Sequence, residues 1–301
     1  MTISVCTLGY GRDEHLANML LGLRQSHRPP REVVIAVMDD ARYDVPMTSF
    51  PVHQIVLGRG DIPLAKARNT AAQAARGEHL AFLDIDCIPH PALLQDYAEA
   101  LQTHNGVLMG EVGYLPRGAT EYGLDFAEFD RIAVRHSERP GPPDFPTRRA
   151  EDYRCFWSLN FAMHRSDFDA SGGFDGSYVG YGGEDTDFGR TCADRAIPLW
   201  WVRGAKAYHQ YHKHHMPPVH HLDAVLHNAG VFQDKWGEPT MQHWLRAFRL
   251  MGLAEPQNGR WVKLRDPGEA ELALTRQQEH QPYASSATVL EQLEREAGLA
   301  A

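Results

Sequence analysis

Cysteine is scarce in this chain of 301 residues. The four cysteines are far apart, and no two of them form a C-x-x-C pair; they are Cys6, Cys87, Cys155 and Cys192. This spacing excludes a disulfide framework and a zinc ribbon, and it fits a reducing compartment. We therefore expect a cytoplasmic protein.

Long hydrophobic runs and an excess of positive charge are also lacking. No stretch approaches the roughly 18 apolar residues of a membrane span, and residues 2–8 are too short and lack the charged flank of a signal peptide. The net charge of -9 argues against nucleic acid as a partner, because phosphate backbones need a basic surface. We expect a soluble protein; the sequence leaves peripheral contact with a membrane open.

The chain does contain enough apolar residues, 43%, to bury a large core. Over the first 110 residues, short β-branched runs alternate with apolar residues at helical spacing, which predicts an α/β fold with a mostly parallel central sheet and flanking helices. We expect strands at 3–8, 33–38, 52–57, 79–83, 107–114, 159–164 and 198–202. Helices are expected at 16–23, 63–76, from 184 and from 218. We expect a mobile loop or crossing at 135–150, and beyond 237 two weak amphipathic helices with a polar linker.

Two carboxylates directly follow one apolar strand, in the segment Phe82-Leu83-Asp84-Ile85-Asp86. Side chains two apart in an extended segment share a side, so both can address one cation. One or two acids, together with substrate phosphates, commonly hold Mg²⁺ or Mn²⁺. The alternative is a turn before Pro89.

A glycine-rich turn precedes a short acidic helix, in the segment Gly182-Gly183-Glu184-Asp185-Thr186-Asp187. Glycines allow a backbone to approach a ligand closely. Asp187 fits an acid that complements the helix dipole, whereas Asp185 is expected on the inward face. An inward carboxylate beside such an opening is a candidate general base.

Several basic side chains and a group of histidines complete the candidate residues. Arg12 and Arg68 lie where they could bind a diphosphate. Taken alone, each is also explained as an ordinary side chain exposed to solvent. Six histidines lie between 209 and 221, most of them expected at the surface, with one or two as metal ligands.

Together these segments resemble the A-type (GT-A) glycosyltransferases, in particular glycosyltransferase family 2 and the galactosyltransferase-like group with a Gly-Gly-Glu-Asp motif. The resemblance covers residues 3–237. It includes the Asp84-x-Asp86 motif, Gly172-Gly173-Phe174-Asp175, and Ala207-Tyr208-His209-Gln210. It implies a nucleotide-sugar-binding half at 1–115, an acceptor-binding and catalytic half at 116–237, and a C-terminal helical extension at 238–301.

The resemblance also implies roles for individual residues. The nucleotide sugar would contact Thr7, Arg12, Asp39, Asp40, Arg68, Asp84, Ile85 and Asp86. The acceptor or the transferred sugar would contact Trp157, Asn160, Gly182, Gly183 and Glu184. The metal, Mn²⁺ or Mg²⁺, would be held by Asp86 and His209, with Asp84 near it and His212 competing with His209.

The implied reaction is transfer of a sugar from a nucleotide diphosphate donor, with UDP-sugars favoured, to a hydroxyl of a carbohydrate or glycoconjugate. Asp185 would be the general base and Glu184 would hold a sugar, so that a single displacement inverts the anomeric centre. A retaining enzyme is the alternative, because Gly-Gly-Glu also occurs there. A sugar-phosphate nucleotidyltransferase would need a longer glycine-rich loop after the first strand. A non-catalytic carbohydrate-binding protein would use aromatic residues such as Trp157 and Trp200.

Overall fold

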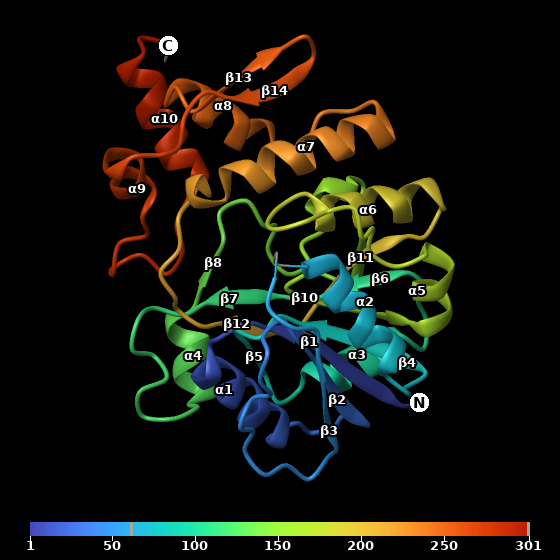
Figure 1. Cartoon of the computed structure of the whole chain (residues 1–301). Coiled ribbons are helices and arrows are strands. Elements are labelled where there is room, and N and C mark those ends of the chain that lie inside the picture. The colour runs from blue at the N-terminus through green and yellow to red at the C-terminus, as the bar shows by residue number, and fades with distance from the viewer. Residues whose placement is uncertain (61–62, 300–301) are drawn as a thin grey trace.

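The computed structural model describes residues 1–60 and 63–299, and its centre is an eight-stranded sheet (Figure 1). The strand order is β3-β2-β1-β4-β10-β6-β11-β9. These strands are β1 (Ile3–Gly9), β2 (Glu32–Val37), β3 (Val52–Val56), β4 (His79–Leu83), β6 (Val107–Met109), β9 (Thr147–Arg149), β10 (Asn160–His164) and β11 (Leu199–Val202). All except β9 and β10 run in one direction, which confirms the predicted α/β class and mostly parallel sheet.

Both faces of this sheet are covered by helices. Alternate residues of β1 enter two different hydrophobic clusters, Ile3 and Val5 on one face and Cys6 and Leu8 on the other. The first face packs on α1 (Asp13–Arg24) and α3 (Leu93–Ala100), and the second on α2 (Leu64–Ala74), α5 (Arg165–Ser171) and α6 (Glu184–Asp194). Burial on both faces explains why β1, β2 and β4 read as continuous apolar runs.

A second sheet, of order β5-β12-β7-β8, adjoins the end of β4. Its strands are β5 (Cys87–Pro89), β7 (Val112–Tyr114), β8 (Val134–Arg135) and β12 (Ala207–His209), and α4 (Phe126–Ile132) packs against it. Because β5 directly follows Asp86 and pairs Cys87 with His209, this sheet brings position 209 back to the end of β4.

The segment 135–150 contains more structure than predicted. It begins in β8, and β9 pairs antiparallel with β11 at the edge of the large sheet. Two of the three residues of β9 are exposed, so this edge strand carries no apolar pattern that the sequence could reveal. A one-turn 3₁₀ helix, η1 (Tyr153–Cys155), follows.

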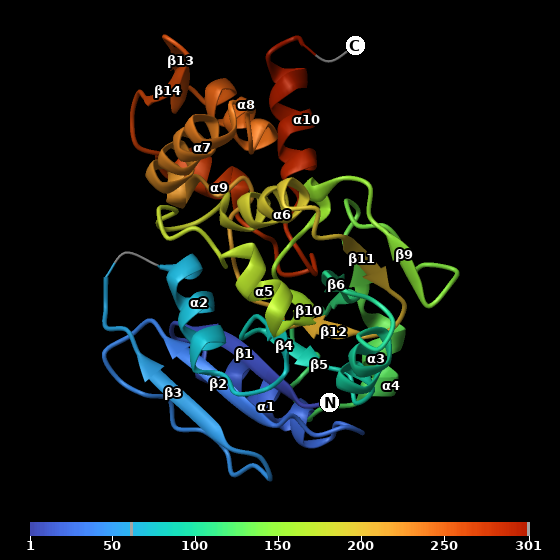
Figure 2. The ribbon, with the colours of Figure 1, turned by 90° about the vertical axis from the view of Figure 1, so that its right-hand side faces the viewer.

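The prediction for the C-terminal segment was incomplete, because helices are present but a hairpin and a further helix were not expected. Instead of two helices and a linker, it forms α8 (Gln242–Leu250), the hairpin β13 (Ala254–Gln257)–β14 (Arg260–Lys263), α9 (Glu269–Thr275) and α10 (Ser286–Glu296). These elements share one hydrophobic cluster with α7 (Leu222–Trp236) and the preceding turn η2 (Val219–His221). Figures 1 and 2 show them stacked on α7 at one end of the molecule. Whether 238–301 is a unit of its own stays a prediction.

No helix among the described residues is both long and apolar enough to cross a membrane.

Candidate active site

Charged residues that were predicted to act together lie close to one another at the carboxyl ends of the parallel strands. β1 and β4 are neighbours, so Arg12, just after β1, meets Asp86, just after β4, in a direct ion pair. In open α/β sheets, ligands bind at this edge. The structure therefore places the Asp84-x-Asp86 motif where a donor site is expected.

Asp86, His209 and His212 form a cluster whose candidate ligand atoms all lie within 4.8 Å of one another. The Nε2 of His209 is 3.5 Å and the Nε2 of His212 is 3.3 Å from the Asp86 carboxylate. The buried Nδ1 of His209 has no hydrogen-bond partner among the described residues. Sequence reasoning treated the two histidines as competitors, whereas the structure brings both to the same carboxylate.

The protonation states of this cluster suit a metal ligand set. Burial alone would raise the pKa of Asp86, but His209, His212 and Arg12 together hold that pKa well below its ordinary value. Burial lowers the pKa of His209 to about 4. At neutral pH the cluster therefore offers an ionised carboxylate and a neutral imidazole, the forms in which these groups bind cations.

Arg68 connects the end of β4 with the start of α6. It is 4% exposed, and its guanidinium donates to Asp84 at 3.3 Å and to Glu184 at 3.1 Å. Burial raises the pKa of Asp84 to about 6 against the lowering effect of Arg68. Arg68 thus links Asp84, one of the predicted donor residues, with the glycine-rich motif.

Asp185 differs from its neighbour Glu184, because within the described residues its carboxylate forms no ion pair. Its contacts are the backbone N–H of Thr186 at 2.7 Å and the hydroxyl of the same residue at 3.5 Å. Burial, followed by the charge of Glu184, raises the pKa of Asp185 to about 7. A carboxylate with this proton affinity is suited to accept a proton near neutral pH.

Gly182 and Gly183 both adopt positive φ, 93° and 89°. A Cβ on Gly182 would approach Met241 and Trp244 to 3.0 Å, so glycine also allows close packing against the C-terminal elements. The turn is therefore fixed by packing as well as by backbone freedom.

Asp187 lies in the first turn of α6, where an acid complements the helix dipole, but it also has buried partners that the sequence did not indicate. It is 1% exposed and accepts hydrogen bonds from Trp236 Nε1 at 2.7 Å, Lys235 Nζ at 2.9 Å and the Tyr178 hydroxyl at 3.1 Å. The spacing of apolar residues in α6 does not predict that α7 packs against the first turn of α6. Asp187 thus ties the start of α6 to the end of α7.

Replacing Asp187 by Ala is expected to lower the free energy of unfolding by about 3 kcal/mol, because it leaves the Tyr178 hydroxyl and the Trp236 N–H without their acceptor. Urea unfolding measures the change. The matched control is Asp194→Ala on the same helix, whose carboxylate is exposed and 3.7 Å from Arg190. Equal stability of the two variants would contradict this role.

The two acids after β2 are held by an arginine that sequence reasoning missed. Arg59 Nε donates to Asp39 at 2.6 Å, and its backbone N–H donates to Asp40 at 2.9 Å. This contact lowers the pKa of Asp39. The Asp39 side chain is 24% exposed and that of Asp40 67%, so Asp39 is the more enclosed of the two. Thr7, on β1, is 2% exposed, and its hydroxyl has no partner among the described residues.

Two residues predicted to contact a ligand have buried side chains. The side chain of Ile85 is 6% exposed and packs in the core cluster beneath β1. Asn160 is 1% exposed, and its amide is engaged by the Tyr97 hydroxyl at 2.8 Å and by the carbonyls of Ala205 at 2.7 Å and Glu111 at 3.1 Å. Both side chains make contacts within the fold that the sequence did not indicate, and their contacts with a ligand stay predictions.

Trp157, in contrast, belongs to an aromatic group next to the metal-ligand cluster. His136 lies 5.0 Å from Trp157 and 4.2 Å from Tyr283, measured between ring centroids. Tyr114 stacks on His209 at 4.8 Å. Sequence reasoning missed His136, Tyr114 and Tyr283, which come from three distant segments without a shared motif.

Comparison with known proteins gives two family matches. The model described as glycosyl transferase family 2 matches residues 4–170, and the model described as N-terminal domain of galactosyltransferase matches residues 146–214. The first covers more than half of the chain.

Curated relatives have related descriptions. Validoxylamine A glucosyltransferase of Streptomyces hygroscopicus subsp. limoneus is 29% identical over 241 residues, covering 69% of this chain and 52% of the relative. Chondroitin synthase of Escherichia coli is 28% identical over 170 residues, covering 49% of this chain and 25% of the relative. The chain thus spans about half of the first relative's length and a quarter of the second's.

Solved structures show a similar fold. The S. aureus TarS 1-349 structure in complex with UDP-GlcNAc has a TM-score of 0.52 at 15% identity, covering 82% of this chain and 70% of that one. GalNAc-T7 with UDP, GalNAc and Mn²⁺ has a TM-score of 0.52 at 16% identity, covering 70% of this chain and 43% of that one.

Proposed function

Because the chain belongs to glycosyltransferase family 2 and has the GT-A fold, we propose that it transfers a sugar from a nucleotide diphosphate donor to an acceptor hydroxyl. The acceptor would be a carbohydrate or glycoconjugate. The observation that carries the proposal is the cluster of Asp86, His209 and His212 at the carboxyl edge of the sheet, joined through Asp84 and Arg68 to Glu184 and Asp185. A uridine diphosphate sugar is favoured, since both solved neighbours contain UDP or a UDP-sugar.

The residues of the cluster fit a divalent cation. One carboxylate and two imidazoles include nitrogen ligands, which suit Mn²⁺ better than Mg²⁺, and the Nε2 atoms of both histidines face the Asp86 carboxylate at 3.5 Å and 3.3 Å. GalNAc-T7 was solved with Mn²⁺. When bound, such an ion would act as a Lewis acid that neutralises charge on the diphosphate leaving group.

The other residues would bind the nucleotide, bind a sugar and accept a proton. Asp39 and Thr7 would line the nucleotide pocket, and the hydrogen bond from Arg68 would hold the Glu184 carboxylate where a sugar hydroxyl can bond to it. Asp185 would accept the proton of the acceptor hydroxyl. At the same time the hydroxyl oxygen would bond to the anomeric carbon of the donor sugar, and the bond from that carbon to the diphosphate would break. Attack from the face opposite the leaving group inverts that carbon.

The proposal predicts a binding result. UDP with Mn²⁺ at about a hundredfold excess over its Kd should raise the melting temperature by about 5 °C, because the ligand binds only the native state. Thermal shift with a panel of nucleoside diphosphates, with and without Mn²⁺, measures this. In the variant His209→Ala/His212→Ala the Mn²⁺-dependent part should vanish. A shift independent of Mn²⁺ would contradict the metal site, and no shift with any nucleotide would contradict the function.

The raised pKa of Asp185 predicts a pH dependence. Because only the ionised carboxylate accepts a proton, kcat should fall as pH drops through about 7, by about tenfold per pH unit below it. The pKa of His209, about 4, places the loss of that ligand at lower pH. A pH profile of kcat from 5 to 9 tests this, and a flat profile down to pH 5 would contradict the assignment of the base.

A further inference from the structure

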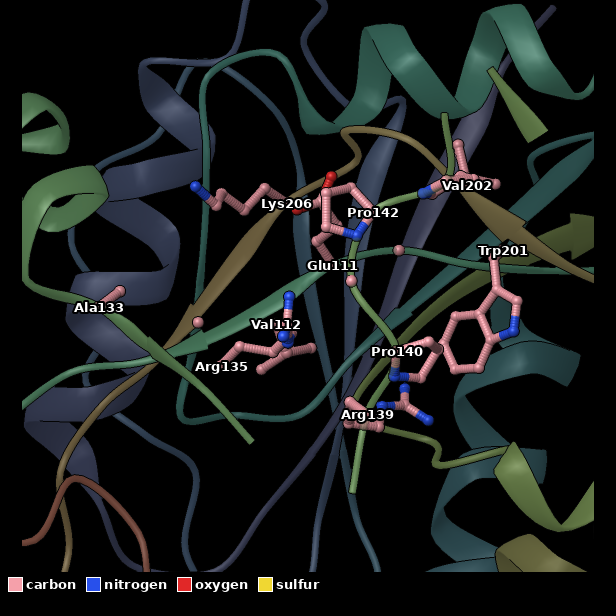
Figure 3. Close-up of a pocket in the computed structure, with 14 residues that line it drawn as sticks. Glu111, Val112, Ala133, Arg135, Arg139, Pro140, Pro142, Trp201, Val202 and Lys206 are labelled. Atoms are coloured by element: carbon pink, nitrogen blue, oxygen red, sulfur yellow. The ribbon is translucent and has the colours of Figure 1, made fainter. Parts of the chain in front are cut away.

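A cavity of about 170 Å³ lies beside the proposed site, where β6 and β11 end. Gly110 and Glu111 follow β6, and Trp201 and Val202 close β11, so the cavity opens at the same edge of the sheet as Asp86. A proline-rich loop of residues 139–143 forms its other wall. Figure 3 shows Arg135, Arg139 and Lys206 among the side chains around it.

Two of these three cations have no acidic partner in the part of the chain that the structure describes. Within the described residues, no carboxylate oxygen lies within the 4.0 Å ion-pair distance of Arg135 or Arg139. Lys206, in contrast, is paired with Asp130 at 2.5 Å. Glu111 also borders the cavity, and its Oε1 accepts from the backbone N–H of Gly204 at 2.8 Å.

Arg139 is held in place without being neutralised. Its guanidinium lies 4.6 Å from the ring centroid of Trp157 and 4.7 Å from that of Trp201, and it donates to the carbonyl of Cys155. Fixing a guanidinium between two aromatic rings removes much of its conformational freedom before a ligand arrives. Its charge is therefore oriented but available.

The same arginine connects the cavity with the reaction centre. Trp157, which covers one face of Arg139, contacts His136, and His136 lies 5.7 Å from Tyr114, the residue stacked on His209. The charges of Arg139 and Asp185 also act on each other. The rings of Trp157, His136 and Tyr114 thus connect Arg139 at the cavity with His209 of the proposed metal cluster. In the strand order the cavity lies on the opposite side of β4 from Asp39, which follows β2.

We propose that this cavity binds a negatively charged group of the acceptor, a carboxylate or a phosphate, while the acceptor's hydroxyl lies at Asp185. Arginine binds both groups through paired N–H donors, and an uncharged acceptor would leave two cations unpaired beside it. This inference rests on the proposed function, because it assigns the acceptor side of that site.

Direct binding of small probes tests the inference, with UDP and Mn²⁺ present to fill the donor pocket. The probes are glucuronate, glucose 6-phosphate and, as the neutral reference, glucose, measured by calorimetry at low salt. We expect the charged probes to bind about tenfold more tightly than glucose, and the preference to shrink as salt rises. A preference for only one charged probe would identify the acidic group as carboxylate or phosphate.

The variant Arg135→Gln should reduce this preference about threefold, and Arg135→Gln/Arg139→Gln should abolish it. Arg135→Gln changes an exposed side chain that forms no ion pair among the described residues, so its effect does not depend on the fold tolerating a change at Arg139. The matched control is Arg131→Gln, an exposed arginine paired with Glu128 outside the cavity, which should change nothing.

Equal binding of glucose and the charged probes would overturn the inference, as would an undiminished preference in the double variant. Failure of the proposed function gives a different result, because UDP would then produce no thermal shift in the unaltered protein. In that case the same titrations without UDP still measure whether the cavity prefers anions.

Discussion

Replacing Asp185 by Asn is expected to lower kcat by about 10² to 10⁴-fold, the contribution of a general base. The amide has nearly the same shape but does not accept the proton of the attacking hydroxyl. The side chain bonds only to Thr186 among the described residues, so its replacement removes no ion pair. Initial rates of sugar transfer at saturating donor and acceptor measure the effect.

Binding of the donor separates this outcome from misfolding. Asp185→Asn should keep the thermal shift with UDP and Mn²⁺, and its pH profile should lose the fall below about 7. Asp194→Asn, at the exposed end of the same helix, is the control and should keep full activity. A variant that retains most of its turnover would show that another group accepts the proton.

Replacing Asp86 by Asn is expected to lower kcat/KM by about 10³-fold or more, because it removes the one negative charge of the metal-ligand cluster. Its carboxylate is also the common partner of Arg12, His209 and His212. Without it the positive charge of Arg12 would oppose binding of a cation at this position. Titration of activity with Mn²⁺ measures the loss, and excess metal should not restore it.

Comparison with Asp84→Asn shows whether the effect belongs to the metal or to general loss of charge. Asp84 contacts Arg68 and is no member of the cluster, so we expect a smaller effect that appears mainly in the KM for the donor. Equal Mn²⁺ dependence in Asp86→Asn and the unaltered protein would refute the assignment of Asp86 as a ligand.

The sequence predicted those parts of the fold that local patterns encode. β1, β2 and β4 are buried on both faces and read as apolar runs, and the acids that follow β4 contrast with the apolar strand before them. The helix at Glu184 was visible from its glycines and first-turn acids. These features depend on residues that are close in sequence.

The contacts that the sequence did not indicate involve residues whose surroundings come from distant segments. Asp187 and Asn160 are polar but buried, because Trp236 and Tyr97, far away in the chain, supply their partners. Arg139 lies in a proline-rich stretch with no periodicity, and only folding places it between Trp157 and Trp201. The C-terminal hairpin was missed because it pairs just two short, largely exposed strands.

The shared arginine of the site has a consequence for how the two substrates influence each other. Arg68 divides its hydrogen bonds between Asp84, on the donor side, and Glu184, the neighbour of the proposed base. A donor that draws the guanidinium toward Asp84 would leave Glu184 less neutralised and thereby strengthen the proton affinity of Asp185. Binding of the donor and protonation of Asp185 would then change each other's free energy by the same amount. Linkage requires this of two equilibria that both depend on the charge of Arg68.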